Sequence, residues 1–136
     1  MNAVISLAIV KIDAELFAIP LGSIKSIESI DRVRNTGEQG WIDLLGQDHL
    51  VMTLDHAPLQ NRELVLVLNS DFNIALEVDS FISSELKQED IWYVPPIMNA
   101  NNSFVEALHY DRNADAVIYI CAEHQLYQHL GAQADA

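Results

Sequence analysis

The sequence is poor in basic residues. Its 136 residues include 7 Lys and Arg against 20 Asp and Glu, which gives a formal net charge of −13. Such a surface repels nucleic acid and anionic membranes, because binding to either requires clustered Lys and Arg side chains that displace counterions. Nucleic-acid binding is therefore excluded. The acidic surface either attracts a basic protein partner or only keeps the chain in solution.

Cysteine and long hydrophobic runs are also scarce. The single cysteine, Cys121, gives no internal disulfide framework of the kind found in small secreted domains. No apolar stretch approaches the roughly 20 residues that a membrane-spanning helix needs. The apolar N-terminus, residues 1–13, lacks a basic region and a small-residue cleavage site, so it is expected to form a first strand instead of a signal peptide. We expect a cytoplasmic chain without membrane insertion.

The motifs of familiar enzyme and cofactor sites are missing. The sequence has no Gly-rich phosphate loop, no CxxC, no HExxH and no serine in a nucleophile elbow. His124 and His129 are five residues apart, whereas two ligands on one helix face need a spacing of three or four. Cys121 has no basic neighbour in sequence and is expected to be a small buried hydrophobe. We therefore expect no catalytic residue, no metal and no cofactor.

What the sequence does contain is a series of short apolar runs separated by turn residues. The runs recur about every ten residues, which predicts eight or nine short strands. The clearest strands are predicted at residues 6–12, 15–19, 41–45, 49–54, 63–68, 73–78 and 116–121. This spacing is typical of a sandwich or barrel and leaves no room for the crossover helices of a parallel sheet. The predicted fold class is all-β.

Other segments have mixed patterns. Ile24, Ile27 and Ile30 are three residues apart, which suits a short helical turn or an irregular strand. Residues 104–110 suit either a strand or a helix face. The remaining predictions are a loop at 32–40, a polar segment at 79–90, a short C-terminal helix at 123–130 and a frayed tail at 131–136. Trp41 and Trp92 are expected either in the core or on a binding surface.

The order of these motifs resembles the CheW family of chemotaxis coupling proteins over nearly the whole chain. Residues 15–20 (ELFAIP) resemble the end of that family's opening hairpin, and residues 24–27 (IKSI) resemble the Val/Ile-x-Glu-Ile segment that follows it. Residues 40–46 (GWIDLLG) resemble the family's Gly-Val-Ile-Asn-Leu-Arg-Gly turn, and residues 63–79 its hairpin ending in Val-Asp. Each motif is short, so the resemblance rests on their order and spacing.

The resemblance implies a single domain over residues 1–136, built of two intertwined five-stranded SH3-like β-barrel subdomains with a short C-terminal helix. It implies a non-catalytic adaptor that couples the cytoplasmic tip of chemoreceptors to the regulatory domain of a chemotaxis-type histidine kinase. In that family an apolar surface of the first barrel contacts the kinase, and a groove between the barrels contacts the receptor. The partner-binding residues expected here are Ile24, Ser26, Ile27, Asp43 and Leu45.

Several positions depart from the family pattern. Ser26 stands where the family has Glu, Leu45 where it has Arg, and Asp43 where it has Asn. Leu50 likewise replaces a common Pro. If the family's Glu and Arg form a charge pair, the loss of both is physically reasonable, because one charged side chain without the other would be unpaired. The resulting surface is more apolar, which predicts a partner set different from a standard chemotaxis array, such as that of a pilus-motility system.

Two functions of other classes stay open on the sequence. A small-molecule-binding β-barrel predicts thermal stabilisation by a metabolite and a pocket with convergent polar groups. An enzyme of unrecognised type requires clustered titratable groups, which no contiguous segment shows. The adaptor predicts binding without turnover.

Overall fold

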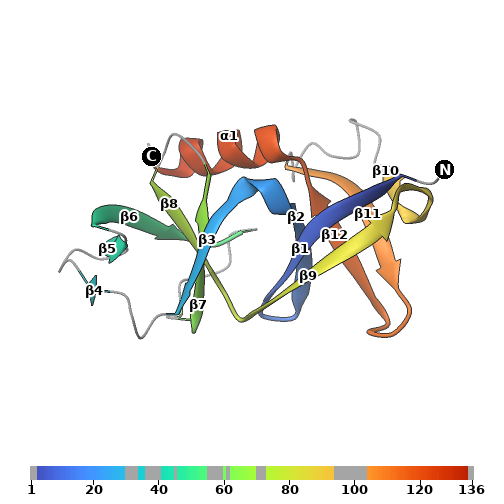
Figure 1. Ribbon diagram of the computed structural model, residues 1–136, viewed down its shortest axis with the longest axis horizontal. Coiled ribbons are helices and arrows are strands. Elements are labelled where there is room, and N and C mark those ends of the chain that lie inside the picture. The colour runs from blue at the N-terminus through green and yellow to red at the C-terminus, as the bar shows by residue number, and fades with distance from the viewer. Residues whose placement is uncertain are drawn as a thin grey trace.

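The computed structural model describes residues 3–29, 34–35, 41–44, 46–54, 60, 62–69, 73–93 and 104–134. Within these residues the chain forms two six-stranded sheets and one α-helix, α1 (Glu123–Ala134) (Figure 1). In spatial order, sheet A contains β10 (Trp92–Tyr93), β11 (Val105–Asp111), β12 (Ala116–Cys121), β2 (Glu15–Pro20), β1 (Val4–Ile12) and β9 (Ser80–Lys87). Sheet B contains β3 (Ile24–Ser29), β7 (Leu64–Leu68), β8 (Ile74–Val78), β6 (Gln47–Met52), β5 (Trp41–Leu44) and β4 (Arg34–Asn35). The predicted all-β class is confirmed.

The two sheets are intertwined because the chain leaves sheet A and later returns to it. After β2, the short 3-10 helix η1 (Leu21–Ser23) leads into β3 of sheet B. After β8, Asp79 leads back into β9 of sheet A. The first and last parts of sheet A meet in the parallel pair β2–β12, and sheet B contains a second parallel pair, β6–β8. All the other pairs are antiparallel, as the predicted hairpins require.

The tight turns follow from residues that tolerate a positive φ. Ile12 pairs with Glu15, so Asp13 and Ala14 form a two-residue turn in which Asp13 has φ 56°. Gly46, between β5 and β6, has φ 80°. Asp and Asn adopt this left-handed conformation more readily than other residues with a Cβ, and Gly adopts it without steric cost.

Some predictions from the sequence were wrong. The described residues form twelve strands instead of the eight or nine predicted. The polar segment at 79–90 contains β9, which pairs without interruption with β1. Its many polar side chains are compatible with a strand because β9 is at the edge of sheet A, where polar side chains face solvent. The helix continues to Ala134 instead of ending at residue 130, and the loop predicted at 32–40 includes the short strand β4.

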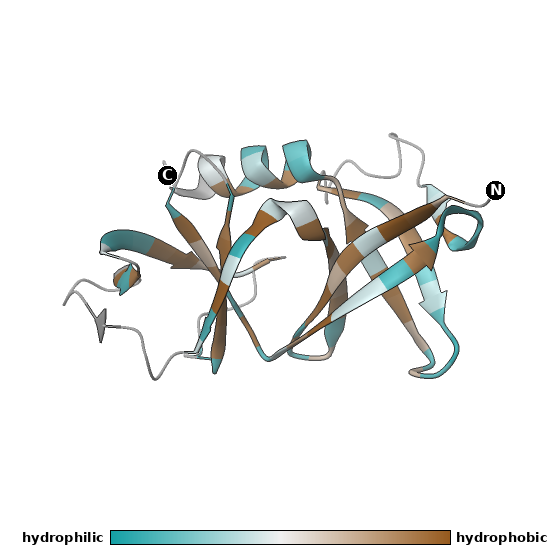
Figure 2. Cartoon of the chain, in the orientation of Figure 1, coloured by the Kyte–Doolittle hydropathy of each residue, from teal (hydrophilic) through white to brown (hydrophobic). Residues whose placement is uncertain are grey.

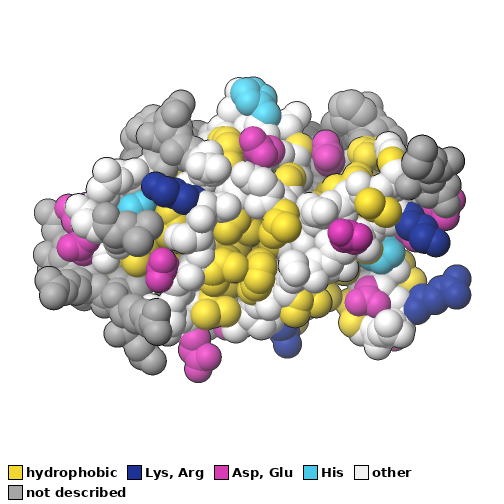
Figure 3. Space-filling view, in the orientation of Figure 1, with side chains coloured by type: hydrophobic (Ala, Val, Ile, Leu, Met, Phe, Trp, Pro, Cys, Tyr) yellow, Lys and Arg dark blue, Asp and Glu magenta, His cyan; other side chains and the backbone are white. Residues whose placement is uncertain are grey.

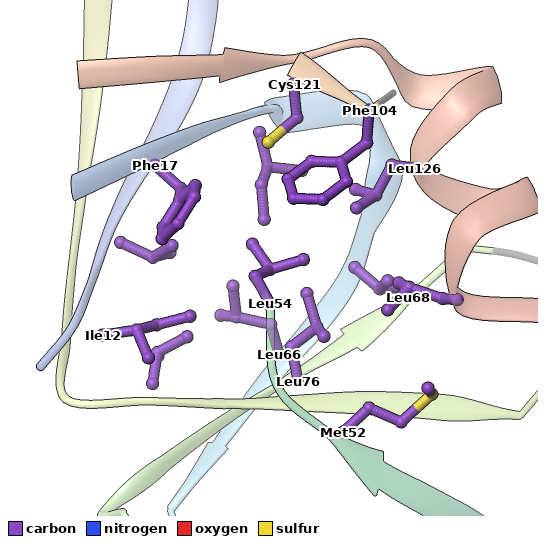
Figure 4. Close-up of a cluster of buried hydrophobic side chains, with 14 of the residues drawn as sticks. Ile12, Phe17, Met52, Leu54, Leu66, Leu68, Leu76, Phe104, Cys121 and Leu126 are labelled. Carbon is purple, nitrogen blue, oxygen red and sulfur yellow. The ribbon is translucent and has the colours of Figure 1, made fainter. Parts of the chain in front are cut away.

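Sheets A and B share one central core. Strands of both sheets contribute buried side chains to it, and β7 is hydrophobic along its whole length (Figure 2). Phe17, Phe104 and Cys121 face the same interior as Leu54 and Leu66 in Figure 4. The fully or nearly buried members are Val10, Ile12, Phe17, Ile19, Met52, Leu54, Leu66, Leu68, Ile74, Leu76, Val78, Phe104, Val105, Cys121, Leu126 and Leu130. Two smaller cores belong to single sheets, one around Leu7 and Ile118 in sheet A and one around Val65 and Val67 in sheet B.

The C-terminal helix closes the central core. In Figure 1, α1 runs along one side of the molecule from the end of β12 towards sheet B. Leu126 and Leu130, one helical turn apart, are completely buried in the central core. The helix is also tied to the crossover, because Ser23 Oγ donates a 2.6 Å hydrogen bond to Glu123 Oε2 and Tyr127 donates its hydroxyl to the Ser23 carbonyl oxygen.

A buried arginine joins the return crossover to the β1–β2 turn. Arg62 donates to Glu77 Oε1 at 2.6 Å and to Asp13 Oδ1 at 2.8 Å, and its Nε is 3.4 Å from Asp79 Oδ1. Burial alone lowers the pKa of Arg62, but the hydrogen bond and charge of Asp13 and the charges of Glu77 and Asp79 outweigh it and raise that pKa. The Asp79 side chain also accepts from the Asp13 backbone N–H. This network fixes where the chain passes between the sheets.

Candidate partner-binding surface

The predicted site begins on β3, an edge strand of sheet B. The register of β3 against β7 shifts between Ile24 and Ser26, so that Lys25 forms a bulge. Residues directly opposite each other in an antiparallel pair lie on the same face of the sheet. Ile24 is opposite Leu68 and Ile27 is opposite Leu66, and both leucines belong to the central core. The bulge therefore brings two isoleucines three residues apart onto one face.

This face of β3 borders the central core between the two sheets. Ile24 is partly buried and packs against that core, and Phe81 of β9 does the same from sheet A. Ile27 is 38% exposed. Figure 3 shows hydrophobic side chains gathered in the middle of the molecule, over the region between β3 and β1–β9 in Figure 1. We call Ile24, Ile27 and Phe81 the inter-sheet surface.

Ser26 lies on the opposite face of β3. It is opposite Val67, which belongs to the small core of sheet B. Its Oγ is buried and has no hydrogen-bond partner within the described residues. A buried hydroxyl without a partner costs about 1–3 kcal/mol relative to a solvated one. Ser26 therefore faces the small core of sheet B and not the inter-sheet surface.

The other two predicted site residues do not join this surface. Asp43 is half-buried on β5, and β7, β8 and β6 lie between β5 and β3 in the order of sheet B. Its neighbour Leu44 is buried in the small core of sheet B. Leu45 lies outside the described residues. The structure thus brings Ile24 and Ile27 together and leaves Asp43 several strands away.

The described part of the chain offers little for metal or thiol chemistry. No group of three or more His, Cys, Asp or Glu side chains there has the arrangement of a metal site. Cys121 is completely buried, and the pKa of its thiol is raised by desolvation and, to a lesser extent, by the charge of Glu106. A thiol in this state is a poor nucleophile, because the thiolate is the reactive form. In the same residues, no helix has the length and apolar character to cross a membrane.

A second surface was not singled out from the sequence. Trp92 on β10 is 76% exposed, and Tyr110 on β11 and Val117 on β12 are also largely exposed. Together they line an open cleft on sheet A, far in sequence from the predicted site. The sequence did not decide whether Trp92 lies in the core or on a binding surface, because a single tryptophan is compatible with both. Only the pairing of β10 with β11 shows that Trp92 belongs beside other exposed apolar side chains.

Comparison with known proteins finds solved structures that resemble this chain, among them a scaffolding protein matched over most of both chains. The crystal structure of the scaffolding protein TtCheW from Thermoanaerobacter tengcongensis superimposes with a TM-score of 0.66. The alignment covers 88% of this chain and 90% of that one, at 16% sequence identity. No family model matches the sequence, and no curated protein matches it significantly. The chain therefore has a CheW-like fold of two intertwined SH3-like sheets with a C-terminal helix, as the resemblance predicted, although each sheet has six strands where five were expected.

Proposed function

We propose that this chain is a divergent, single-domain member of the CheW family and acts in the cytoplasm as a non-catalytic adaptor. It links the cytoplasmic tip of a chemoreceptor to the regulatory domain of a chemotaxis-type histidine kinase, in a chemosensory or pilus-motility system. The observation that carries the proposal is the fold shared with a scaffolding protein over 88% of the chain. Exposed apolar side chains beside a strand edge support it, because such surfaces bind protein partners.

The inter-sheet surface is the proposed contact for the receptor tip. Ile24 is already half-buried against the central core, so a partner side chain that packs there contacts a residue held in place by that core. Ile27 is more exposed and supplies apolar area that binding removes from water. Apolar burial contributes roughly 25 cal/mol per Å², and the gain is largest where little side-chain freedom is lost on binding.

The position of Ser26, on the face of β3 towards the small core of sheet B, gives a physical reason for the replacement of the family's Glu. A carboxylate on the inner face of β3 would need a cationic partner within the small core of sheet B. Ser26 needs none, and its neighbour across the sheet is Val67. In this proposal the substitution changes the interior of sheet B, while Ile24 and Ile27 provide the contact. Asp43 and Leu45 would then belong to a separate contact, proposed for the kinase.

The direct test is reconstitution with purified partners. The chain is mixed with a kinase regulatory domain and a receptor cytoplasmic hairpin from the same source, and complexes are separated by size-exclusion chromatography. We expect a ternary complex that contains all three proteins and forms only when this chain is present. If the chain binds neither partner, alone or together, the adaptor function is wrong.

Leu45 provides a test of the second contact. Leu45→Arg places a charge in an apolar contact, so we expect at least about tenfold weaker binding to the kinase domain, equivalent to loss of roughly 1.4 kcal/mol. Calorimetric titration of the kinase domain measures this change. Unchanged affinity in a folded variant would remove Leu45 from the contact.

A further inference from the structure

Sheet A carries an open cleft of about 540 Å³ near its β10 edge, between β10, β11 and β12. This volume lies within the range of roughly 300–1,000 Å³ typical of small-molecule sites. Its lining combines apolar and aromatic side chains with charged groups at one end. The lining residues are Glu89, Asp90, Trp92, Leu108, His109, Tyr110, Arg112 and Val117. We call it the β10–β12 cleft.

The strand register places the two aromatic residues of the cleft on one face of the sheet. Trp92 of β10 pairs with Leu108 of β11, and Tyr110 is two residues further along β11. Trp92 and Tyr110 are therefore diagonal neighbours on one face, within reach of each other's ring. Tyr110 is in turn opposite Val117. The result is an aromatic and aliphatic floor exposed to solvent, with Trp92 76% and Tyr110 52% exposed.

Two polar contacts hold the walls of the cleft. Tyr110 donates its hydroxyl hydrogen to Asp115 Oδ1, which raises the pKa of the phenol and increases the electron density of the ring. At the charged end, His109 Nδ1 is 3.0 Å from the carbonyl oxygen of Asp90. This contact keeps the 3-10 helix η3 (Gln88–Asp90) against β11.

The charges at the end of the cleft are not neutralised by ion pairs in the described structure. Glu89 and Asp90 are exposed, and neither is within ion-pair distance of a basic side chain among the described residues. Arg112 is the cation in the lining, so Glu89 and Asp90 leave a net charge of −1 there when His109 is neutral. The whole chain carries −13. The local and global potentials therefore both favour a positively charged ligand.

We propose that the β10–β12 cleft binds a small organic cation, an amine or quaternary ammonium with a compact apolar body. The faces of Trp92 and Tyr110 attract the cation through their quadrupoles, and tryptophan is the most effective side chain for this contact. Glu89 and Asp90 add attraction at the open end, and Leu108 and Val117 contact the apolar body of the ligand. This site is separate from the inter-sheet surface and does not depend on the adaptor function.

The test compares two probes that differ in charge but hardly in shape. Choline and its uncharged analogue 3,3-dimethylbutan-1-ol are titrated into the isotopically labelled chain, and amide and indole NMR signals are followed. We expect saturable shifts for Trp92, Tyr110 and Val117 with choline. Because two exposed cation–π contacts distinguish the probes, we expect the uncharged analogue to bind roughly tenfold more weakly.

Two charge variants give opposite predictions. Glu89→Gln removes attraction and is expected to weaken choline binding about two- to fivefold, whereas Arg112→Ala removes repulsion and is expected to strengthen it by a similar factor. Both side chains are exposed, so both variants are expected to fold, which an unchanged amide spectrum outside the cleft verifies. Equal responses to the two probes, shifts located elsewhere, or shifts that do not saturate with choline would each overturn the proposal.

Discussion

Two serines with buried hydroxyl groups show how the same side chain has opposite energetic roles. Ser23 is fully buried and its hydroxyl donates to Glu123, whereas the Oγ of Ser26 has no partner within the described residues. We predict that Ser23→Ala destabilises the protein by about 1–2 kcal/mol, because it removes a hydrogen bond to a charged group. Ser26→Ala is predicted to be neutral or to stabilise by up to about 1 kcal/mol. Urea unfolding of both variants measures the difference in sign.

If Ser26→Ala instead costs more than Ser23→Ala, the hydroxyl of Ser26 has a stabilising partner. The serine pair is a close control, because both substitutions remove one oxygen at a small-side-chain position. Neither substitution creates a cavity large enough to dominate the result.

Arg62 is the residue on which the buried charges of the fold depend. Its guanidinium group contacts three carboxylates, of which Asp13 and Asp79 are 49% and 40% exposed in their side chains while Glu77 is 2% exposed. Arg62→Met therefore leaves Glu77 as an uncompensated buried charge. We predict a loss of about 3–5 kcal/mol of unfolding free energy, measured by chemical denaturation.

A second variant separates the charge effect from the loss of packing. Arg62→Met combined with Glu77→Met replaces the buried pair by apolar side chains, and such replacements are often neutral or stabilising. We expect the double variant to recover most of the lost stability. A double variant as unstable as the single one would show that packing of the arginine, and not its charge, determines the stability.

This network also marks a limit of prediction from sequence. Its members, at positions 13, 62, 77 and 79, are far apart in the chain and no short motif unites them. The one available signal was Glu77, an acidic residue in a strand whose other members are apolar. A charge in such a strand requires a buried partner. The sequence does not identify that partner, because its position depends on the crossover between the sheets.

At the scale of the elements, β3 shows why hydrophobic spacing alone was ambiguous. Isoleucines at three-residue intervals do not follow the two-residue period of a strand. The bulge at Lys25 adds one residue and so restores Ile24 and Ile27 to one face. A bulge of this kind depends on pairing with β7, which is remote in sequence. The hairpins of adjacent runs, by contrast, needed only local turns and were predicted correctly.

The C-terminal helix is predicted to contribute to stability through two leucines. Leu130→Ala removes a fully buried side chain from the central core, so we expect a loss of about 2–5 kcal/mol. Gln128→Ala, an exposed position on the same helix, is the control and is expected to change stability by no more than about 0.5 kcal/mol. Thermal or urea unfolding measures both. Equal effects would mean that the helix adds little to the core.

At the scale of the whole molecule, the intertwining of the sheets determines what lies at the candidate site. The inter-sheet surface combines β3 of sheet B with β9 of sheet A, which are connected through most of sheet B. The sequence predicted Ile24 and Ile27 as partner-binding residues, and that role stays a prediction. Phe81 was not predicted as part of this surface, because the strand nature of β9 was not recognised from the polar sequence at 79–90.

The inter-sheet surface of this CheW-like fold is proposed to bind a signalling partner. The most direct measurement is a calorimetric titration of the receptor hairpin into the chain and into two matched variants, Ile27→Lys and Val4→Lys. Both replace an exposed apolar strand residue by lysine, but Val4 lies on β1, away from the inter-sheet surface. We predict saturable binding that Ile27→Lys weakens at least about tenfold and Val4→Lys leaves unchanged. No binding by the unmodified chain, or an equal effect of the two variants, would show that the inter-sheet surface is not the binding site.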